Sequence, residues 1–305
     1  MSFTDSSRVK SRLYEHIGFL TRVVGERSFR LPQNLERAGG YVGEALRDSG
    51  LKVHREGYPC GNLETANWVA RLEGEARDGR HFLLGAHYDT VTGTPGADDN
   101  ASAVAVLLET ARCLRDIPGL DDTVSFVAFA LEEPPFFGTR SMGSRVHAEY
   151  LKRRGERLDG MLCLEMVGYT CGVPGCQGYF PLVKPLLGSM ARDVRDYIAI
   201  VGSTGSAGLS REVAQAFRGN PDLPVLKLTI PFRGRLIPQV RQSDHSAFWD
   251  LGYSAVMITD TAYYRNPHYH RATDRMETLD FDFMARLVES LVRFFAGYGK
   301  EEASP

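Results

Sequence analysis

The sequence predicts an α/β fold of three layers, in which a central mixed, mainly parallel sheet lies between two layers of helices. Strand-like segments alternate with helix-like segments along most of the chain, which is typical of such sheets. The segment Thr123–Leu131 (TVSFVAFAL) is apolar on both faces, as expected of a strand that is covered on two sides. No Pro/Gly-rich linker divides the chain, so we expect residues 1–305 to form a single domain.

The expected strands are short apolar runs that polar or turn-forming residues bound. In chain order they are Lys52–Arg55, Asn67–Leu72, His81–His87, Thr123–Leu131, Met161–Glu165, Tyr197–Val201, Val225–Ile230 and Ala255–Thr259. The run His81–His87 has the apolar core Phe82-Leu83-Leu84, and polar residues follow it at once. We therefore expect this strand to end at the border of the core.

The expected helices carry apolar residues at the spacing of one helix face. In chain order they are Ser7–Val24, Leu35–Leu46, Asn100–Arg115, Ser141–Arg153, Ser210–Phe217, Ser243–Trp249 and Phe281–Phe295. Gly50 follows the second helix at a position where a glycine commonly ends one. The third helix is rich in small and branched residues, so we expect it to be buried.

Composition and charge exclude several classes of protein. An apolar fraction of 43% and a charged fraction of 24% are ordinary for a chain with a full core. The formal net charge of -2 gives no indication of a nucleic-acid or membrane partner. No apolar run reaches the roughly 18 residues of a membrane helix, and the N-terminal residues lack a secretory-signal pattern. We therefore expect a cytoplasmic protein, with its oligomeric state left open.

The cysteine count does not suggest a disulfide framework, because it is odd. The cysteines are Cys60, Cys113, Cys163, Cys171 and Cys176. Gly172, Pro174 and Gly175 lie between the last two, so a disulfide within this loop is compatible with the sequence. Reduced thiols are nevertheless the expectation for a cytosolic chain. Zinc held by cysteines is disfavoured, since the close-spaced pairs of such sites are absent.

Carboxylates and imidazoles follow five of the expected strands, where ligands bind in open α/β sheets. The groups are His87-Tyr88-Asp89, Asp98-Asp99-Asn100, Glu132-Glu133, Glu165, Asp244-His245, and His268 with His270. Each group alone is commonly a surface pair, a turn or a helix cap. Adjacent Glu132 and Glu133 are costly to bury without a cation, and no run of Lys or Arg lies near them. Histidine and carboxylate ligands without cysteine predict a catalytic zinc site.

The order of these motifs resembles a family of zinc exopeptidases that contains bacterial leucyl-type aminopeptidases, glutamate carboxypeptidases and glutaminyl cyclases. The resemblance implies the zinc-exopeptidase fold and covers most of the chain. The matching segments are GAHYDT (85–90), PGADDNASAVAVLLE (95–109), LEEPPFFGT (131–139), LEM (164–166), SDHSAFWDLGY (243–253) and NPHYHRATD (266–274).

The resemblance implies a site for two zinc ions per chain. His87 and Glu165 would hold one ion, Glu133 and His270 would hold the other, and Asp99 would bridge both. These five residues are the candidate metal ligands.

The resemblance also implies the catalytic residues. Glu132 would act as the general base. Asp89 would orient the first histidine ligand, and Asp274 would do the same near His270. A cis peptide bond would follow the bridging aspartate, between Asp99 and Asn100.

The implied activity is hydrolysis of peptide or peptide-like amide bonds, with an aminopeptidase as the first expectation. Glu165 departs from this branch, because family aminopeptidases commonly have aspartate there, so a carboxypeptidase or dipeptidase stays open. The cyclase branch usually works with one zinc ion, whereas His87 in an intact motif favours two ions and hydrolysis. A catalytically inactive binding protein is disfavoured by the complete ligand set. A serine hydrolase is discounted, since no Gly-x-Ser-x-Gly elbow is present.

Two polar residues and several aromatic residues are candidates for substrate binding. His245 follows Asp244 at a helix start and is a candidate donor to the substrate carbonyl. Arg241 lies near Arg233 and Arg235, and an arginine there would grip the free carboxylate of a carboxypeptidase substrate. Aromatic residues next to the motifs are candidates for a specificity pocket. They are Tyr169, Phe136, Phe137, Tyr263 and Tyr264.

Overall fold

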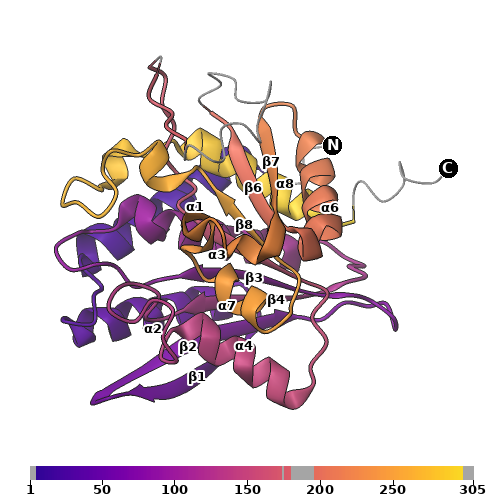
Figure 1. Cartoon of the computed structure of the whole chain (residues 1–305), viewed down its shortest axis with the longest axis horizontal. Helices are drawn as coiled ribbons and strands as arrows, with labels where there is room; N and C mark the ends of the chain where they lie inside the picture. The colour runs from indigo at the N-terminus through magenta and orange to yellow at the C-terminus, as the bar shows by residue number, and fades with distance from the viewer. Residues whose placement is uncertain (1–4, 174, 180–195, 298–305) are drawn as a thin grey trace.

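The computed structural model describes residues 5–173, 175–179 and 196–297, and the strands in these ranges form one eight-stranded sheet (Figure 1). The strands are β1 (Lys52–Cys60), β2 (Leu63–Leu72), β3 (His81–His87), β4 (Thr123–Phe129), β5 (Gly160–Glu165), β6 (Ile198–Ser203), β7 (Val225–Ile230) and β8 (Ala255–Thr259). Their order across the sheet is β1-β2-β4-β3-β5-β8-β6-β7. In Figure 1 the β1–β2 hairpin lies at one end of the sheet and β6 and β7 lie at the other.

The centre of the sheet is parallel and its flanks are antiparallel. Strands β4, β3, β5 and β8 run in the same direction, whereas β2 is antiparallel to β4 and β6 is antiparallel to β8. The carboxyl ends of four neighbouring strands therefore meet at one edge of the sheet. This arrangement confirms the predicted mixed, mainly parallel sheet.

Helices cover both faces of the sheet. They are α1 (Ser6–Gly18), α2 (Pro32–Asp48), α3 (Ala103–Arg115), α4 (Gly143–Arg154), α6 (Ala207–Arg218), α7 (His245–Asp250) and α8 (Phe281–Phe295). Helices α1, α2, α3, α6 and α8 share one core, into which Phe82 and Leu84 of β3 point. Leu83 points to the opposite face, where α4 and α7 pack. None of the described helices is both long enough and apolar enough to span a bilayer.

Several element boundaries differ from the prediction. In the first two strands they differ because glycine and proline have roles that the local sequence does not reveal. The hairpin β1–β2 extends to Cys60 and Leu63, and only Gly61 and Asn62 connect its strands. Pro59 is tolerated because β1 is an edge strand, where one side of the backbone needs no partner. The predicted strands Lys52–Arg55 and Asn67–Leu72 are therefore too short.

The start of the third predicted helix also differs, and this difference shapes the site. Regular α-helix begins at Ala103 rather than at Asn100. The preceding residues form the irregular π-helical turn Ala97–Ser102, in which Asp99 and Asn100 leave helical backbone angles. The peptide bond between Asp99 and Asn100 is cis, as the family resemblance implies.

Candidate metal centre

The polar residues that follow the strands converge at the carboxyl edge of the parallel strands. His87 is the last residue of β3, and Glu165 is the last residue of β5. Glu132 and Glu133 follow the end of β4, and Asp99 lies in the turn before α3. These five side chains are buried because the strands and the turn bring them into contact below the surface. His270 joins them from the loop after β8 and is 30% exposed in its side chain.

Two carboxylate–imidazole triples share Asp99 and are arranged as the ligands of two metal ions. The first contains His87, Asp99 and Glu165, and the second contains Asp99, Glu133 and His270. In the first, His87 Nε2 lies 3.4 Å from Asp99 Oδ1 and 3.5 Å from Glu165 Oε2. In the second, His270 Nε2 lies 3.1 Å from Asp99 Oδ2 and 3.4 Å from Glu133 Oε2. Each oxygen of Asp99 therefore faces a different triple, as a bridging ligand requires.

Orphaned polar atoms at this site test whether metal ions fit the donor set. His87 Nε2 and Glu133 Oε1 are buried and have no hydrogen-bond partner. Such atoms are costly to bury unless something binds them. Imidazole nitrogens and carboxylate oxygens without thiolates are the donors of catalytic zinc sites. The residues present therefore fit a pair of zinc ions.

The charges of the site point to the same conclusion. Burial raises the pKa of Glu132 well above its ordinary value, and the charges of Glu133 and Glu165 raise it further. Burial, with the Asp99 charge, raises the pKa of Glu133 to about 8. In the described ranges no Lys or Arg forms an ion pair with these carboxylates, whose ion-pair partners are histidines. Divalent cations would supply the missing positive charge.

Asp89 holds the ligands in place from behind. Its two carboxylate oxygens accept the backbone N–H groups of Glu132 at 3.1 Å and Glu133 at 3.0 Å. His87 Nδ1 lies 3.3 Å from the Asp89 backbone oxygen and 3.5 Å from Asp89 Oδ1. This contact leaves the other ring nitrogen of His87 for a metal ion. Asp89 therefore contacts the first histidine, as expected, and also orients the Glu132–Glu133 segment.

Asp274 differs from its predicted place near His270. Its carboxylate accepts the backbone N–H groups of Asp98 at 2.9 Å and Asp99 at 3.1 Å. The chain between residues 271 and 274 turns back toward the start of the irregular turn, so Asp274 supports the bridging aspartate instead. Tyr269 is the group that contacts His270, since their rings stack with centroids 3.7 Å apart.

Ser243 is a contact that the sequence analysis did not single out. Its hydroxyl donates to Glu165 Oε2 at 2.5 Å, so it orients this candidate ligand. Ser243 belongs to the same motif as His245, so its place in this motif could have indicated a role at the site.

Two candidate substrate-binding residues point away from the site. His245 is fully buried, with Nε2 2.8 Å from the Val240 carbonyl and its ring edge-on to Trp249. Arg241 donates to the Arg233 carbonyl and to Asp250, both at 2.7 Å. The ring of His245 is therefore buried at the start of α7, and Arg241 is held by contacts within the chain. A role of either residue in substrate binding stays a prediction.

A cavity of about 840 Å³, which includes its open mouth, adjoins Glu165. Its floor is apolar and comes from β6, β7 and β8: Ala199, Val201, Leu226, Leu228 and Met257. Its walls carry amides and phenols: Gln177, Tyr179, Tyr197, Gln239, Gln242, Tyr263, Tyr264 and Tyr269. Of the aromatic candidates, Tyr263 and Tyr264 therefore line the cavity. Tyr169 packs on His268 and Phe136 packs on Phe29, outside the described lining, which does not include Phe137 either.

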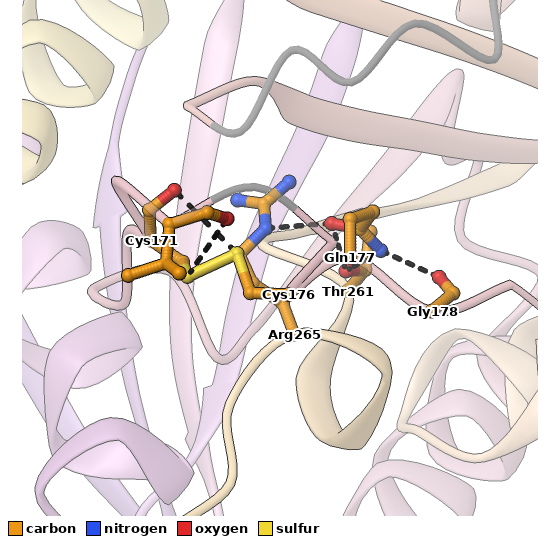
Figure 2. Close-up of a disulfide and its surroundings, with 7 residues drawn as sticks. Cys171, Cys176, Gln177, Gly178, Thr261 and Arg265 are labelled. Carbon is orange, nitrogen blue, oxygen red and sulfur yellow. Dashed lines mark hydrogen bonds between the residues drawn. A yellow bond between two sulfur atoms is a disulfide. The ribbon is translucent and has the colours of Figure 1, made fainter.

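Cys171 and Cys176 form a disulfide in the loop after β5 (Figure 2). The expectation of reduced thiols is therefore wrong for this pair, because the turn through Gly175, with φ +83°, brings the two cysteines together. The other cysteines are free and buried: Cys60, Cys113 and Cys163.

The disulfide loop is attached to a wall of the cavity. Figure 2 shows Gln177, directly after Cys176, between Thr261 and Arg265. Gln177 donates to Thr261 Oγ1 at 3.0 Å and accepts from Arg265 Nε at 2.8 Å. The loop that starts at the disulfide therefore packs against the segment that carries the lining tyrosines.

Comparisons with known proteins agree with this geometry. The chain is 38% identical over 290 residues to the uncharacterized protein YfbL of Escherichia coli (strain K12), covering 92% of this chain and 86% of that protein. The zinc aminopeptidase BSAP from Bacillus subtilis has the same fold, with a TM-score of 0.72, 13% identity and 93% of each chain covered. The glutaminyl cyclase of Porphyromonas gingivalis also shares it, with a TM-score of 0.70, 19% identity and coverage of 96% of this chain and 98% of that chain. Residues 67–295 match Peptidase family M28, and the chain therefore belongs to this family of metallopeptidases.

Proposed function

We propose that this chain is a zinc-dependent aminopeptidase that removes residues with bulky apolar side chains from the N-termini of peptides. The observation that carries the proposal is the cavity beside Glu165, because it joins an apolar floor to a candidate ligand of the first triple. Burying a side chain of the size of Leu, Met or Phe on this floor would contribute roughly 1.5–3 kcal/mol. The donor set and the zinc aminopeptidase of the same fold support zinc as the metal.

The charge of the cavity supports recognition of a free amine rather than a free carboxylate. A carboxypeptidase needs a cation that pairs with the C-terminal carboxylate of its substrate. The described lining contains no Lys or Arg, and its one acidic residue is Glu165. Arg241, the sequence candidate for that cation, is held by Asp250. A substrate ammonium group is the better partner for this lining.

The proposed roles of the catalytic residues follow from their positions. Two bound zinc ions would act as Lewis acids and lower the pKa of water. Glu132 belongs to neither triple that shares Asp99. It forms a third group with His87 and Glu133, in which its Oε2 lies 3.9 Å from His87 Nε2. Glu132 would therefore take the proton of the attacking water and return it to the leaving amine. Asp89 would hold the Glu132–Glu133 backbone so that the two side chains serve different roles.

The test combines a substrate panel with a metal count. The purified chain would be assayed with Leu, Phe, Ala and Lys p-nitroanilides, with N-acetyl-Leu p-nitroanilide as the matched blocked control. Dipeptides with blocked N-termini and free C-termini would test for a carboxypeptidase, and N-terminal Gln peptides would test for a cyclase. We expect about two zinc ions per chain and the largest kcat/KM for Leu or Phe, with no turnover of the blocked anilide.

Two outcomes would contradict the proposal. Cleavage of blocked dipeptides at their free C-termini, without turnover of the anilides, would show a carboxypeptidase. Formation of pyroglutamate with one zinc ion per chain would show the cyclase activity that the Porphyromonas gingivalis protein of this fold is named for.

A further inference from the structure

Arg27 is a fully buried cation that bonds to backbone carbonyls. Its Nε donates to the Tyr88 carbonyl at 2.8 Å, its Nη1 to the Pro95 carbonyl at 2.7 Å and its Nη2 to the Gly96 carbonyl at 2.9 Å. Burying a guanidinium is costly unless its donors are satisfied. A side chain used in this way connects the segments to which those carbonyls belong.

Both connected segments carry candidate metal ligands. Tyr88 directly follows His87, and Gly96 precedes Asp99 by three residues. The guanidinium of Arg27 therefore joins the end of β3 to the turn that presents the bridging aspartate. These two segments carry His87 Nε2 and Asp99 Oδ1, which lie 3.4 Å apart in the first triple.

The segment that carries Arg27 is fastened to the same place. Nη1 also donates to the carbonyls of Leu20 at 3.1 Å and Gly25 at 3.0 Å, which ties the side chain to its own neighbourhood. The backbone N–H of Arg27 donates to Thr90 Oγ1 at 3.0 Å. Arg27 lies before residues 67–295, so the support comes from outside the part of the chain that matches the family.

The close approach of Arg27 depends on the glycine at position 96. Gly96 has φ +58°, and a Cβ there would lie 2.9 Å from Arg27 Nη2 and 2.3 Å from the Asp99 backbone oxygen. A side chain at this position would also lie 2.4 Å from Thr90 Cγ2, so it would clash with the turn as well as crowd the guanidinium. The turn is therefore shaped to admit the guanidinium beside the bridging ligand.

The charge of Arg27 also faces the site. Burial lowers the pKa of its guanidinium to about 10, with the charges of Asp274, Asp89 and Asp99 opposing this effect, so the group stays charged at neutral pH. No carboxylate of the described residues forms an ion pair with it. The guanidinium is thus a fixed positive charge behind the candidate ligands. It forms no hydrogen bond with a side-chain atom that would bind a metal ion.

We propose that Arg27 is a positioning residue of the metal centre, which sets the spacing between His87 and Asp99 by binding the backbone beside each. This inference rests on the proposed metal centre. Arg27 touches neither substrate nor metal, and it acts through the two ligand-bearing segments. Lysine replaces it poorly, because a single ammonium group lacks the planar fork that reaches three carbonyls in different directions.

The experiment measures metal binding separately from folding. Zinc affinity by chelator competition, the visible absorption of the Co²⁺-loaded protein, and Tm of the metal-free protein would be compared for R27M, R27K and T90V. We expect R27M to weaken zinc binding about 10–100-fold and to change the Co²⁺ spectrum, as loss of a supporting contact does. R27K should recover part of this loss. T90V, which removes only the contact to the Arg27 backbone, should weaken binding less than about tenfold.

R112Q is the matched control, because it removes a partly buried guanidinium, 15% exposed, that pairs with Glu109 on α3. It should lower Tm of the metal-free protein and leave zinc affinity and the Co²⁺ spectrum unchanged. Wild-type zinc affinity and Co²⁺ spectrum in R27M would overturn the inference. If R27M does not fold, wild-type zinc affinity and a wild-type Co²⁺ spectrum in both R27K and T90V would overturn the inference. A wild-type chain that binds no zinc would instead refute the proposed metal centre itself.

Discussion

Among the described residues, the buried acid at Glu109 and the buried acid at Glu133 differ in how their charge is balanced. Glu109 on α3 is fully buried, with Arg12 Nε at 2.8 Å and Arg112 Nη2 at 2.9 Å. Burial raises the pKa of Glu109, but hydrogen bonds from His16, Arg112 and Arg12 outweigh it and lower the pKa to about 2. At the metal centre, burial raises the pKa of Glu133 to about 8, because no arginine forms an ion pair with this carboxylate.

The comparison shows that the chain supplies arginines as ion-pair partners for Glu109 but not for Glu133. The Glu109 cluster is complete within the chain and joins α1 to α3. The cluster around Glu133 is left with an excess of negative charge, although Arg27 lies behind it. The natural interpretation is that the second cluster is balanced from outside, by divalent cations.

The largest effect that would sharpen this comparison is expected for E132Q. Glutamine keeps the shape of Glu132 but cannot take a proton, so kcat should fall by roughly 10²–10⁴-fold. Zinc content should stay at the wild-type value, because Glu132 lies outside the two triples that share Asp99. Steady-state kinetics with metal analysis on the same sample would check this, and near wild-type turnover would remove Glu132 from its proposed role.

The next effect contrasts the two clusters directly through E109Q and E133Q. E109Q leaves Arg12 and Arg112 without their counter-charge, so the free energy of unfolding should fall by roughly 2–3 kcal/mol with zinc affinity unchanged. Burial raises the pKa of Glu133 to about 8, so this carboxyl is mostly protonated at pH 7 in the metal-free protein. E133Q should therefore leave the stability of the metal-free protein near the wild-type value while zinc affinity falls. Urea denaturation with and without chelator would measure both variants. Equal changes in the free energy of unfolding and in zinc affinity for E109Q and E133Q would contradict the comparison.

The smallest effect is a pH dependence of the metal-free protein. The pKa of Glu133 is raised to about 8. That of His270 is raised to about 10, because the hydrogen bonds that its ring donates to Asp99 and Glu133 outweigh burial. Between pH 6.5 and 8 the folded chain therefore binds more protons at these groups than the unfolded chain, and stability falls as pH rises. The slope should be on the order of 1 kcal/mol per pH unit.

The same pH series with zinc provides the control. Bound metal would take the place of those protons, so the zinc-loaded protein should lose this slope and keep its Tm from pH 6.5 to 8. Calorimetry of both forms would measure it. A metal-free protein that becomes more stable with rising pH in this window would contradict the assignment of excess negative charge to the metal centre.

The residues that converge at the metal centre were predictable because their types are conspicuous where they occur. A carboxylate pair directly after the apolar strand ending at Leu131, and an imidazole at the end of the strand before it, are costly to bury without a cation. The pocket floor carried no such signal. Leu226, Leu228 and Met257 look like ordinary core residues, and only the arrangement of β6, β7 and β8 exposes them to a cavity.

The sequence by itself determined the fold class and which side chains could hold metal, because strand periodicity and ligand chemistry are local properties. The tertiary structure alone decided where His245 points, that Cys171 meets Cys176, and that Arg27 stands behind the ligands. These outcomes depend on which distant segments pack against each residue. A side chain's own neighbours in sequence do not specify that packing, since the same histidine, cysteine or arginine is stable in several surroundings.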